Sequence, residues 1–172
     1  EEKITSVEGI ELFTNLTYLN LKNQFIKDAS PIEALKKLEK LYITYTEIPS
    51  IQVKEMPELR DLRLFGNKNI KEIDVRSNTK LDTLYIQDTQ ISEIDVTNNK
   101  ELIDLNVNRT NLTRLILTDL PKLNQVLAVK CQISSVSFKG LPAIKKIYID
   151  NNQLTRVNLK DLPELAEGEE VV

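Results

Sequence analysis

The chain has 172 residues, 23 of them basic and 26 acidic, and its formal net charge is −3. That length suits one domain with a substantial core, and 41% hydrophobic with 28% charged residues indicates a folded protein rather than a disordered one. The sequence has no histidine and one cysteine, Cys131. This composition excludes Ser-His-Asp triads, Cys-His pairs, imidazole metal sites and an internal disulfide.

Charge and hydropathy exclude further classes. The charge balance gives no basic footprint for nucleic acid, and no apolar run is long enough for a transmembrane segment. The sequence contains neither a signal peptide nor a pattern typical of a cofactor site. We therefore expect no nucleic acid, cofactor or metal among the partners of this chain.

The first segment, 1–15, carries apolar residues at every third place. Ile4, Val7, Ile10 and Phe13 have the spacing that returns in 26–35 at Ile26, Ala29, Ile32 and Leu35. The segment therefore matches the back half of a repeat, and we predict a partial N-terminal repeat or cap.

Residues 16–164 contain seven copies of an LxxLxL pattern, whose starts lie 22, 21, 22, 21, 21 and 21 residues apart. The copies begin at Leu16, Leu38, Leu59, Leu81, Leu102, Leu123 and Ile144. Each copy predicts one short strand, a turn and an extended or 3₁₀ return, stacked so that the leucines form one core. We expect a right-handed leucine-rich repeat solenoid with a curved parallel β-sheet of about seven strands.

The other positions of the repeat keep the same phase. An apolar residue follows five places after each triplet, except in the third repeat, where it slips by one to Ile70. An apolar-x-apolar pair follows from the second repeat onward, as in Leu115/Leu117 and Val136/Phe138. Residues 165–172 begin an eighth unit that stops after its first residues. We therefore predict a truncated C-terminal repeat or a frayed tail. A truncated repeat favours the interpretation that this chain is a piece of a longer protein.

Cys131 occupies a column that holds Asn, Thr or Gln in the other repeats: Gln24, Thr46, Asn67, Thr89, Thr110 and Asn152. Side chains at this place satisfy turn backbone groups between adjacent coils. A buried structural thiol is therefore the prediction for Cys131. A nucleophile is disfavoured, because the chain has no histidine to act as its base.

The repeats resemble those of bacterial internalins. The stretch 4–21 and the 22-residue unit that starts at Ile26-Lys-Asp-Ala-Ser-Pro carry this likeness, and Ile94-Asp-Val-Thr-Asn-Asn resembles the 21-residue repeats of bacterial surface proteins. The chain departs from the family in lacking a recognisable helical N-terminal cap and a following immunoglobulin-like domain. The resemblance implies a secreted or surface-anchored adhesin that binds host proteins or other surface proteins and acts as a virulence factor.

The positions between the leucines point out from the concave sheet, because side chains alternate along a strand. All five tyrosines fall at such positions, and arginines and Phe65 lie among them. Tyrosine and arginine carry many protein interfaces, although tyrosine is also simply a good strand former. We predict a partner-binding concave face made of Tyr18, Tyr42, Tyr45, Arg63, Phe65, Tyr85, Arg109 and Tyr148.

The expected function is therefore recognition of a protein ligand, such as a host cell-surface protein, with a glycan as an alternative ligand. An intracellular scaffold or regulator and a structural spacer in a larger surface protein are the alternative functions. Carboxylate pairs such as Asp61/Asp82 and Asp82/Asp104 occur on neighbouring strands. A shallow open sheet is expected to desolvate neither carboxylate, so we do not expect an enzyme.

Overall fold

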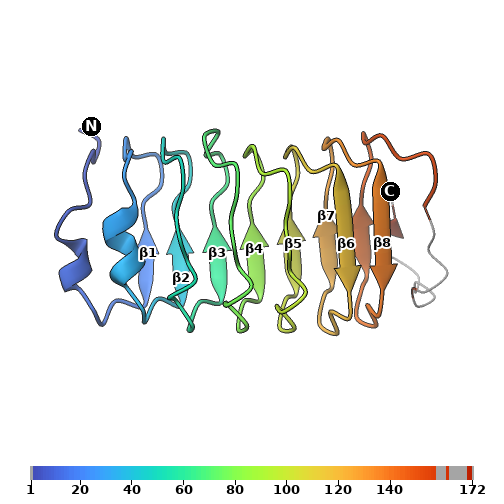
Figure 1. The fold of residues 1–172 in the computed structure, drawn as a ribbon, viewed down its shortest axis with the longest axis horizontal. Coiled ribbons are helices and arrows are strands. Elements are labelled where there is room, and N and C mark those ends of the chain that lie inside the picture. Colours follow the sequence, from blue (N-terminus) through green and yellow to red (C-terminus); the bar gives the residue numbers. More distant parts are fainter. Residues whose placement is uncertain (1, 158–161, 163–169, 172) are drawn as a thin grey trace.

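The computed structural model is a single stack of β-coils (Figure 1) and describes residues 2–157, 162, 170 and 171. Each of the seven LxxLxL triplets contributes one strand to a parallel sheet, and β10 adds an eighth, in the order β1-β2-β3-β4-β5-β7-β9-β10. These strands are β1 Tyr18–Asn20, β2 Lys40–Tyr42, β3 Asp61–Arg63, β4 Thr83–Tyr85, β5 Asp104–Asn106, β7 Gln125–Leu127, β9 Lys146–Tyr148 and β10 Glu170–Val171. The predicted leucine-rich repeat solenoid is confirmed.

The core is the stack of leucine, isoleucine and valine side chains between the sheet and the returns. Every residue of the seven triplets except Leu16 is buried, and Leu41, Leu62 and Leu84 at the centre of β2, β3 and β4 have no exposed surface. The one-residue slip of the third repeat also places Ile70 in the core, fully buried. Burial of this continuous apolar stack is the dominant favourable contribution to folding.

The returns form 3₁₀ helices at the N-terminal end, η1 Ile10–Leu12 and η2 Ser30–Ala34, which lie side by side (Figure 1). Within the predicted partial repeat 1–15, Val7 is buried, whereas Ile4 and Phe13 are 47% and 64% exposed. The Phe25 backbone N–H donates to the Ile4 carbonyl at 2.9 Å, so this half-coil is tied to the first full one. The predicted segment 165–172 lies outside the described residues, apart from the strand β10.

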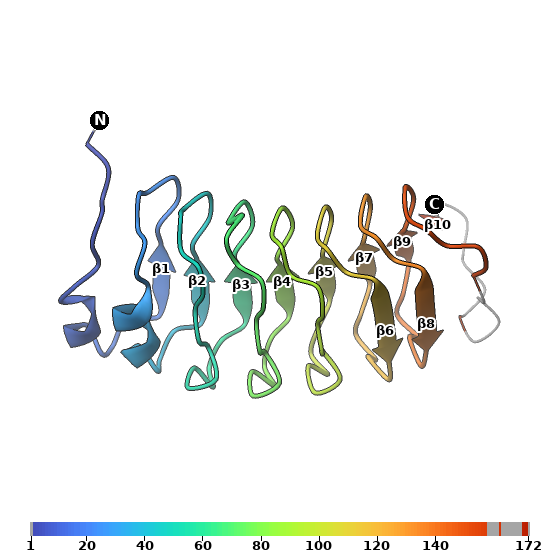
Figure 2. The same cartoon turned by 45° about the horizontal axis from the view of Figure 1, so that its top comes forward.

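Two later returns pair into a second parallel sheet, which the repeat pattern did not predict. β6 Arg114–Thr118 and β8 Ser135–Lys139 run in register and lie in front of β7 and β9 (Figure 2). In earlier returns an aspartate occupies the middle position, where Asp95 accepts from the Thr97 backbone N–H at 3.0 Å. Ile116 and Ser137 occupy this middle position in β6 and β8. Because neither carries a carboxylate, the backbone N–H groups of these two returns remain available for hydrogen bonds between β6 and β8.

Candidate functional site

The outward side of the eight-stranded sheet, here called the sheet face, is the face that the sequence predicts to be concave. The parallel register aligns one outward residue of each repeat in a row across it, here called the aromatic row. From β1 to β9 the aromatic row reads Asn20, Tyr42, Arg63, Tyr85, Asn106, Leu127 and Tyr148. The structure therefore brings three of the predicted residues, Tyr42, Arg63 and Tyr85, directly beside one another.

The Arg63 guanidinium lies between two tyrosine rings. Its central carbon is 4.6 Å from the ring centroid of Tyr42 and 5.0 Å from that of Tyr85. Tyr18 continues this cluster through an edge-to-face contact with Tyr42, with ring centroids 5.2 Å apart. Cation–π and edge-to-face contacts of this kind hold the rings in defined orientations. Four predicted site residues thus form one rigid patch over β1 to β4.

Asp61 is the centre of this patch, and sequence reasoning did not include it among the site residues. Its two carboxylate oxygens accept from Arg63 Nε and Nη2, each at 2.9 Å, and the Tyr42 hydroxyl donates to the same carboxylate. The Asp61 side chain is only 11% exposed. Burial, together with the nearby Asp61, raises the pKa of Tyr42 to about 12, so its hydroxyl stays protonated and donating.

The expectation that the open sheet desolvates no carboxylate is wrong for two aspartates. Asp61 is buried because the side chains of Arg63 and Tyr42 cover it. Burial also raises the pKa of Asp104 on β5, and the nearby Asp82 adds to this effect. Thr44, which directly follows the triplet that begins at Leu38, is also buried, at 3% exposure.

Three other predicted residues lie in the turns that follow the strands rather than on the sheet face. Tyr45 and Arg109 adopt left-handed backbone conformations, with φ of 54° and 53°. The ring of Tyr45 meets that of Phe65 edge to face at 5.4 Å. Arg109 forms a two-pronged ion pair with Asp88, with both N–O distances 2.6 Å, and this contact lowers the pKa of Asp88. These residues form a second cluster, here called the turn cluster.

Tyr148 on β9 lies apart from both clusters. It belongs to the aromatic row, but β5 and β7 separate its strand from β4. Its row neighbour on β7 is Leu127, which is half-buried. The predicted set of eight residues is therefore two clusters and one outlying tyrosine.

Gly66 supports the turn cluster, and its replacement by alanine is expected to displace Tyr45. A Cβ atom at position 66 would lie 2.5 Å from Tyr45 Cδ1, and the φ of Gly66 is +78°. We expect a loss of about 1–2 kcal/mol in the free energy of unfolding, from backbone strain plus the clash. Gly9 has φ +90°, but no atom lies within 4 Å of the place that a Cβ would occupy there, so Gly9→Ala measures strain alone. Urea unfolding of both variants checks this, and equal losses would contradict the clash.

Cys131 is buried, as predicted, together with Thr46, Asn67, Thr89 and Thr110 of the same turn column, whereas Gln24 and Asn152 at its ends are half-buried. Cys131 Sγ lies 3.1 Å from the Val107 carbonyl oxygen and 3.4 Å from Thr110 Oγ1. Thr110 and Thr89 donate to carbonyls of their own turns, both at 2.8 Å. The prediction of a structural thiol in a ladder of turn-satisfying side chains is confirmed.

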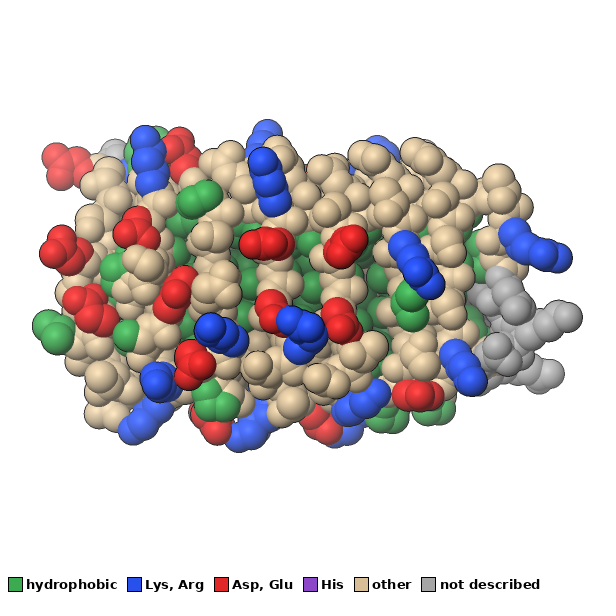
Figure 3. All heavy atoms as spheres, in the orientation of Figure 1, with side chains coloured by type: hydrophobic (Ala, Val, Ile, Leu, Met, Phe, Trp, Pro, Cys, Tyr) green, Lys and Arg blue, Asp and Glu red, His purple; other side chains and the backbone are tan. Residues whose placement is uncertain are grey.

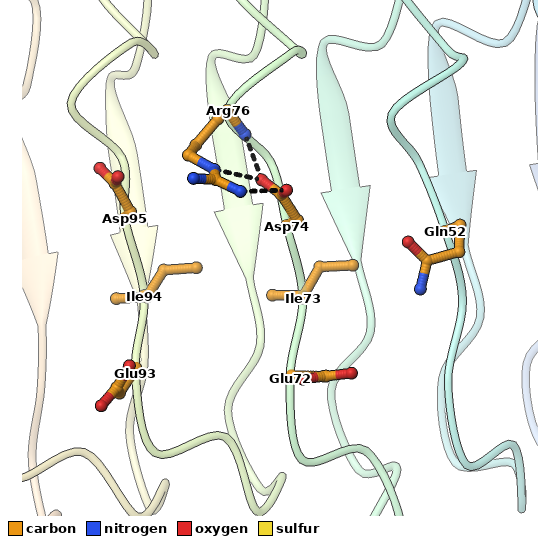
Figure 4. Close-up of a pocket in the computed structure, with 8 residues that line it drawn as sticks. All are labelled: Gln52, Glu72, Ile73, Asp74, Arg76, Glu93, Ile94 and Asp95. Atoms are coloured by element: carbon orange, nitrogen blue, oxygen red, sulfur yellow. Dashed lines mark hydrogen bonds and ion pairs between the residues drawn. The ribbon is translucent and has the colours of Figure 1, made fainter.

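The opposite side of the molecule, here called the return face, carries charged side chains around hollows with an apolar floor (Figure 3). One groove of about 590 Å³ runs between successive returns (Figure 4) and is lined by Gln52, Glu72, Ile73, Asp74, Arg76, Glu93, Ile94 and Asp95. Arg76 binds Asp74 through Nε and Nη2 at 2.9 and 2.7 Å. No group of three or more potential metal ligands was found among the described residues.

The Asp74–Arg76 pair gives a testable pH dependence. Hydrogen bonds from the Arg76 side chain and backbone lower the pKa of Asp74 from 3.8 to about 2. A lowered folded-state pKa contributes stability above the unfolded-state value, and this contribution is lost as the pH falls through the folded-state value. Asp74→Asn is therefore expected to reduce the loss of stability between pH 3.8 and about 2. Urea unfolding across that range checks this, with Glu72→Gln as the control; identical profiles for both variants would refute it.

The repeat register, the apolar stack and the turn ladder define the leucine-rich repeat class of solenoid proteins. Among solved structures, internalin C2 from Listeria monocytogenes shares 22% identity over 93% of this chain and 74% of that chain, with a TM-score of 0.75. The functional domain of InlJ from the same organism shares 22% identity over 89% of this chain, with a TM-score of 0.70. The leucine-rich repeat domain of APL1B shares 14% identity over 95% of this chain and 62% of that chain, with a TM-score of 0.63.

These likenesses confirm the resemblance to internalins at the level of the fold. This chain spans 40% of the InlJ chain that it matches. No protein-family model and no curated protein matches the sequence. Among the described residues, no helix has the length and apolar character needed to cross a membrane.

Proposed function

We propose that this chain is a protein-recognition module that binds its partner on the sheet face. The observation that carries the proposal is the patch built on Asp61, in which Tyr42, Arg63 and Tyr85 are held in fixed orientations. Rigid aromatic and arginine side chains lose little conformational entropy when a partner covers them. Such a patch is therefore suited to burying surface against another protein with little rearrangement.

The setting proposed for this recognition is a bacterial surface or secreted protein of adhesin type, with a host cell-surface protein as partner. The support is the fold shared with internalin C2 and InlJ of Listeria monocytogenes, together with repeats that resemble the internalin units. The proposed role is non-catalytic. Within the described part of the chain, the buried carboxylate of the patch is fully engaged by Arg63 and Tyr42.

The test is a binding screen against an array of purified extracellular domains, with a glycan array run beside it. The wild-type chain is compared with a Tyr42/Tyr85/Tyr148 triple alanine variant. The matched control is a double alanine variant at Arg114 and Ile116, which are exposed on β6 of the return face. Circular dichroism and thermal unfolding establish that all three proteins are folded.

A protein hit that the triple variant loses and the return-face control keeps would support the proposal. A hit that survives in the triple variant would move the site away from the aromatic row and overturn the assignment. Hits on glycans alone would replace protein recognition by sugar recognition. The absence of any hit would count against recognition and favour a spacer.

A further inference from the structure

Asp104 and Asp61 occupy the same row of the sheet face but have opposite environments. The register pairs Asp61 with Thr83 and Thr83 with Asp104, so the two aspartates lie two strands apart in one row. Asp61 is fully engaged by Arg63 and Tyr42. Within the described residues, the Asp104 carboxylate accepts no hydrogen bond and joins no ion pair, although it is half-buried.

The charges around Asp104 do not compensate it. Asp82 approaches from the start of β4, and its one hydrogen bond in the described structure comes from Thr83 Oγ1 at 2.9 Å. Arg63 is the cation whose charge lowers the pKa of Asp104, but its Nε and Nη2 groups already donate to Asp61. Burial raises the pKa of Asp104, and the nearby Asp82 adds to this effect. Two carboxylates thus remain unneutralised at the centre of the sheet face.

Apolar and aromatic surface borders these carboxylates. Ile103, which precedes β5, is 41% exposed, and Leu127 on β7 is half-buried. Tyr85 on β4 is close enough for Asp104 to raise the pKa of its hydroxyl, although burial is the larger cause. A long basic side chain could rest its methylene stem on such surface and place its charged head between the carboxylates.

We propose that Asp104 and Asp82 receive an arginine side chain of the protein partner, packed against Tyr85 and Ile103. This inference rests on the proposed function, because it names the chemistry of the partner at the same face. Arginine fits better than lysine, since its planar fork of donors can serve carboxylates on two neighbouring strands at once. The negative charge offered to the partner is confined to Asp104 and Asp82, because the neighbouring Asp61 forms an ion pair with Arg63.

The test needs no identified partner and uses the full chain. N-acetyl-argininamide is titrated into the isotopically labelled protein, and the amide shifts of Asp104, Tyr85 and Ile103 are followed by NMR. N-acetyl-citrullinamide, which has nearly the same shape but no charge, is the control ligand. Asp104→Asn is the test variant, and Asp95→Asn, which removes a carboxylate from the return face, is the control variant.

We expect saturable shifts at these three residues with the arginine compound. Asp104→Asn should weaken the binding at least about fivefold, as loss of a charge-assisted contact implies, and Asp95→Asn should leave it unchanged. Equal shifts with the citrulline compound, unchanged binding in Asp104→Asn or no saturable shift would each overturn the inference. A partner from the array that depends on Tyr42 and Tyr85, combined with no arginine binding, would refute this inference alone. Arginine binding without any protein hit would refute only the proposed function.

Discussion

Replacing Asn67 by alanine is expected to lower the free energy of unfolding by about 3–5 kcal/mol. Asn67 is fully buried in the turn after β3 and connects two coils. Its Oδ1 accepts from the backbone N–H and hydroxyl of Thr46 at 2.9 and 2.6 Å. Its Nδ2 donates to the carbonyls of Ile43 and Leu64 at 2.6 and 2.7 Å. Alanine would leave these backbone groups buried without partners, which is why the expected loss exceeds that of one hydrogen bond.

Two further variants make the Asn67 prediction specific. Asn69 is exposed two residues later and makes a single 3.1 Å bond to the Glu47 carbonyl, so Asn69→Ala should change stability by less than about 0.5 kcal/mol. Asn67→Thr introduces the residue type that serves the same place at Thr89 and Thr110, and should recover part of the loss. Urea unfolding of the three variants is the measurement. Similar values for Asn67→Ala and Asn69→Ala would show that the ladder does not hold the coils.

The fold was predictable because its stabilising contacts repeat. Because the leucine triplets recur at a constant spacing, their side chains stack in one core. The one-residue insertion before Ile70 does not disturb this stack, since Ile70 is fully buried.

The second sheet was not predictable from that spacing, since β6 and β8 share it with returns that form no strand. Part of the difference lies in the middle residue of each return: Asp74 and Asp95 accept from the backbone N–H two residues later, whereas Ile116 and Ser137 carry no carboxylate. Gln52 has the same place and also lacks a carboxylate, but its own backbone N–H donates to Glu33 Oε1 at 2.9 Å.

The site was predictable only in part. Alternation along the strands correctly predicted that no tyrosine would enter the core, and register then aligned Tyr42 with Arg63 and Tyr85. Tyrosine and arginine do not favour the left-handed conformation of Tyr45 and Arg109, so the signal for it lay in the other repeats: Asn23, Gly66 and Asn151 occupy the same column and also have positive φ. The buried role of Asp61 was hidden, because it depends on two side chains folding over it from Arg63 and Tyr42.

The two aspartates of one row are expected to respond in opposite directions when their charges are removed. Asp61→Asn should lower the free energy of unfolding by about 2–3 kcal/mol, because it leaves the Arg63 guanidinium without its ion pair. This expected loss is smaller than that for a fully buried ion pair, because the Arg63 side chain is 34% exposed. Asp104→Asn should raise the free energy of unfolding by no more than about 0.5 kcal/mol at neutral pH, because burial disfavours the charged form of Asp104 but solvent screens much of that penalty at a half-exposed carboxyl.

The Asp61→Asn and Asp104→Asn variants also test whether the sheet face has an unpaired carboxylate for a partner. In Asp61→Asn, the pKa of Tyr42 should also fall from about 12, since its hydroxyl loses a charged acceptor, and ultraviolet titration of the tyrosines measures this. Urea unfolding of both variants at neutral pH, and of Asp104→Asn again at low pH, gives the stabilities. The gain from Asp104→Asn should shrink as the pH falls through the folded-state pKa of Asp104 and vanish below the unfolded-state value of 3.8, where the wild-type side chain is neutral in both states. A loss of stability in both variants would mean that Asp104 already has a stabilising partner within the chain, and the sheet face would then have no unpaired carboxylate there for an incoming arginine.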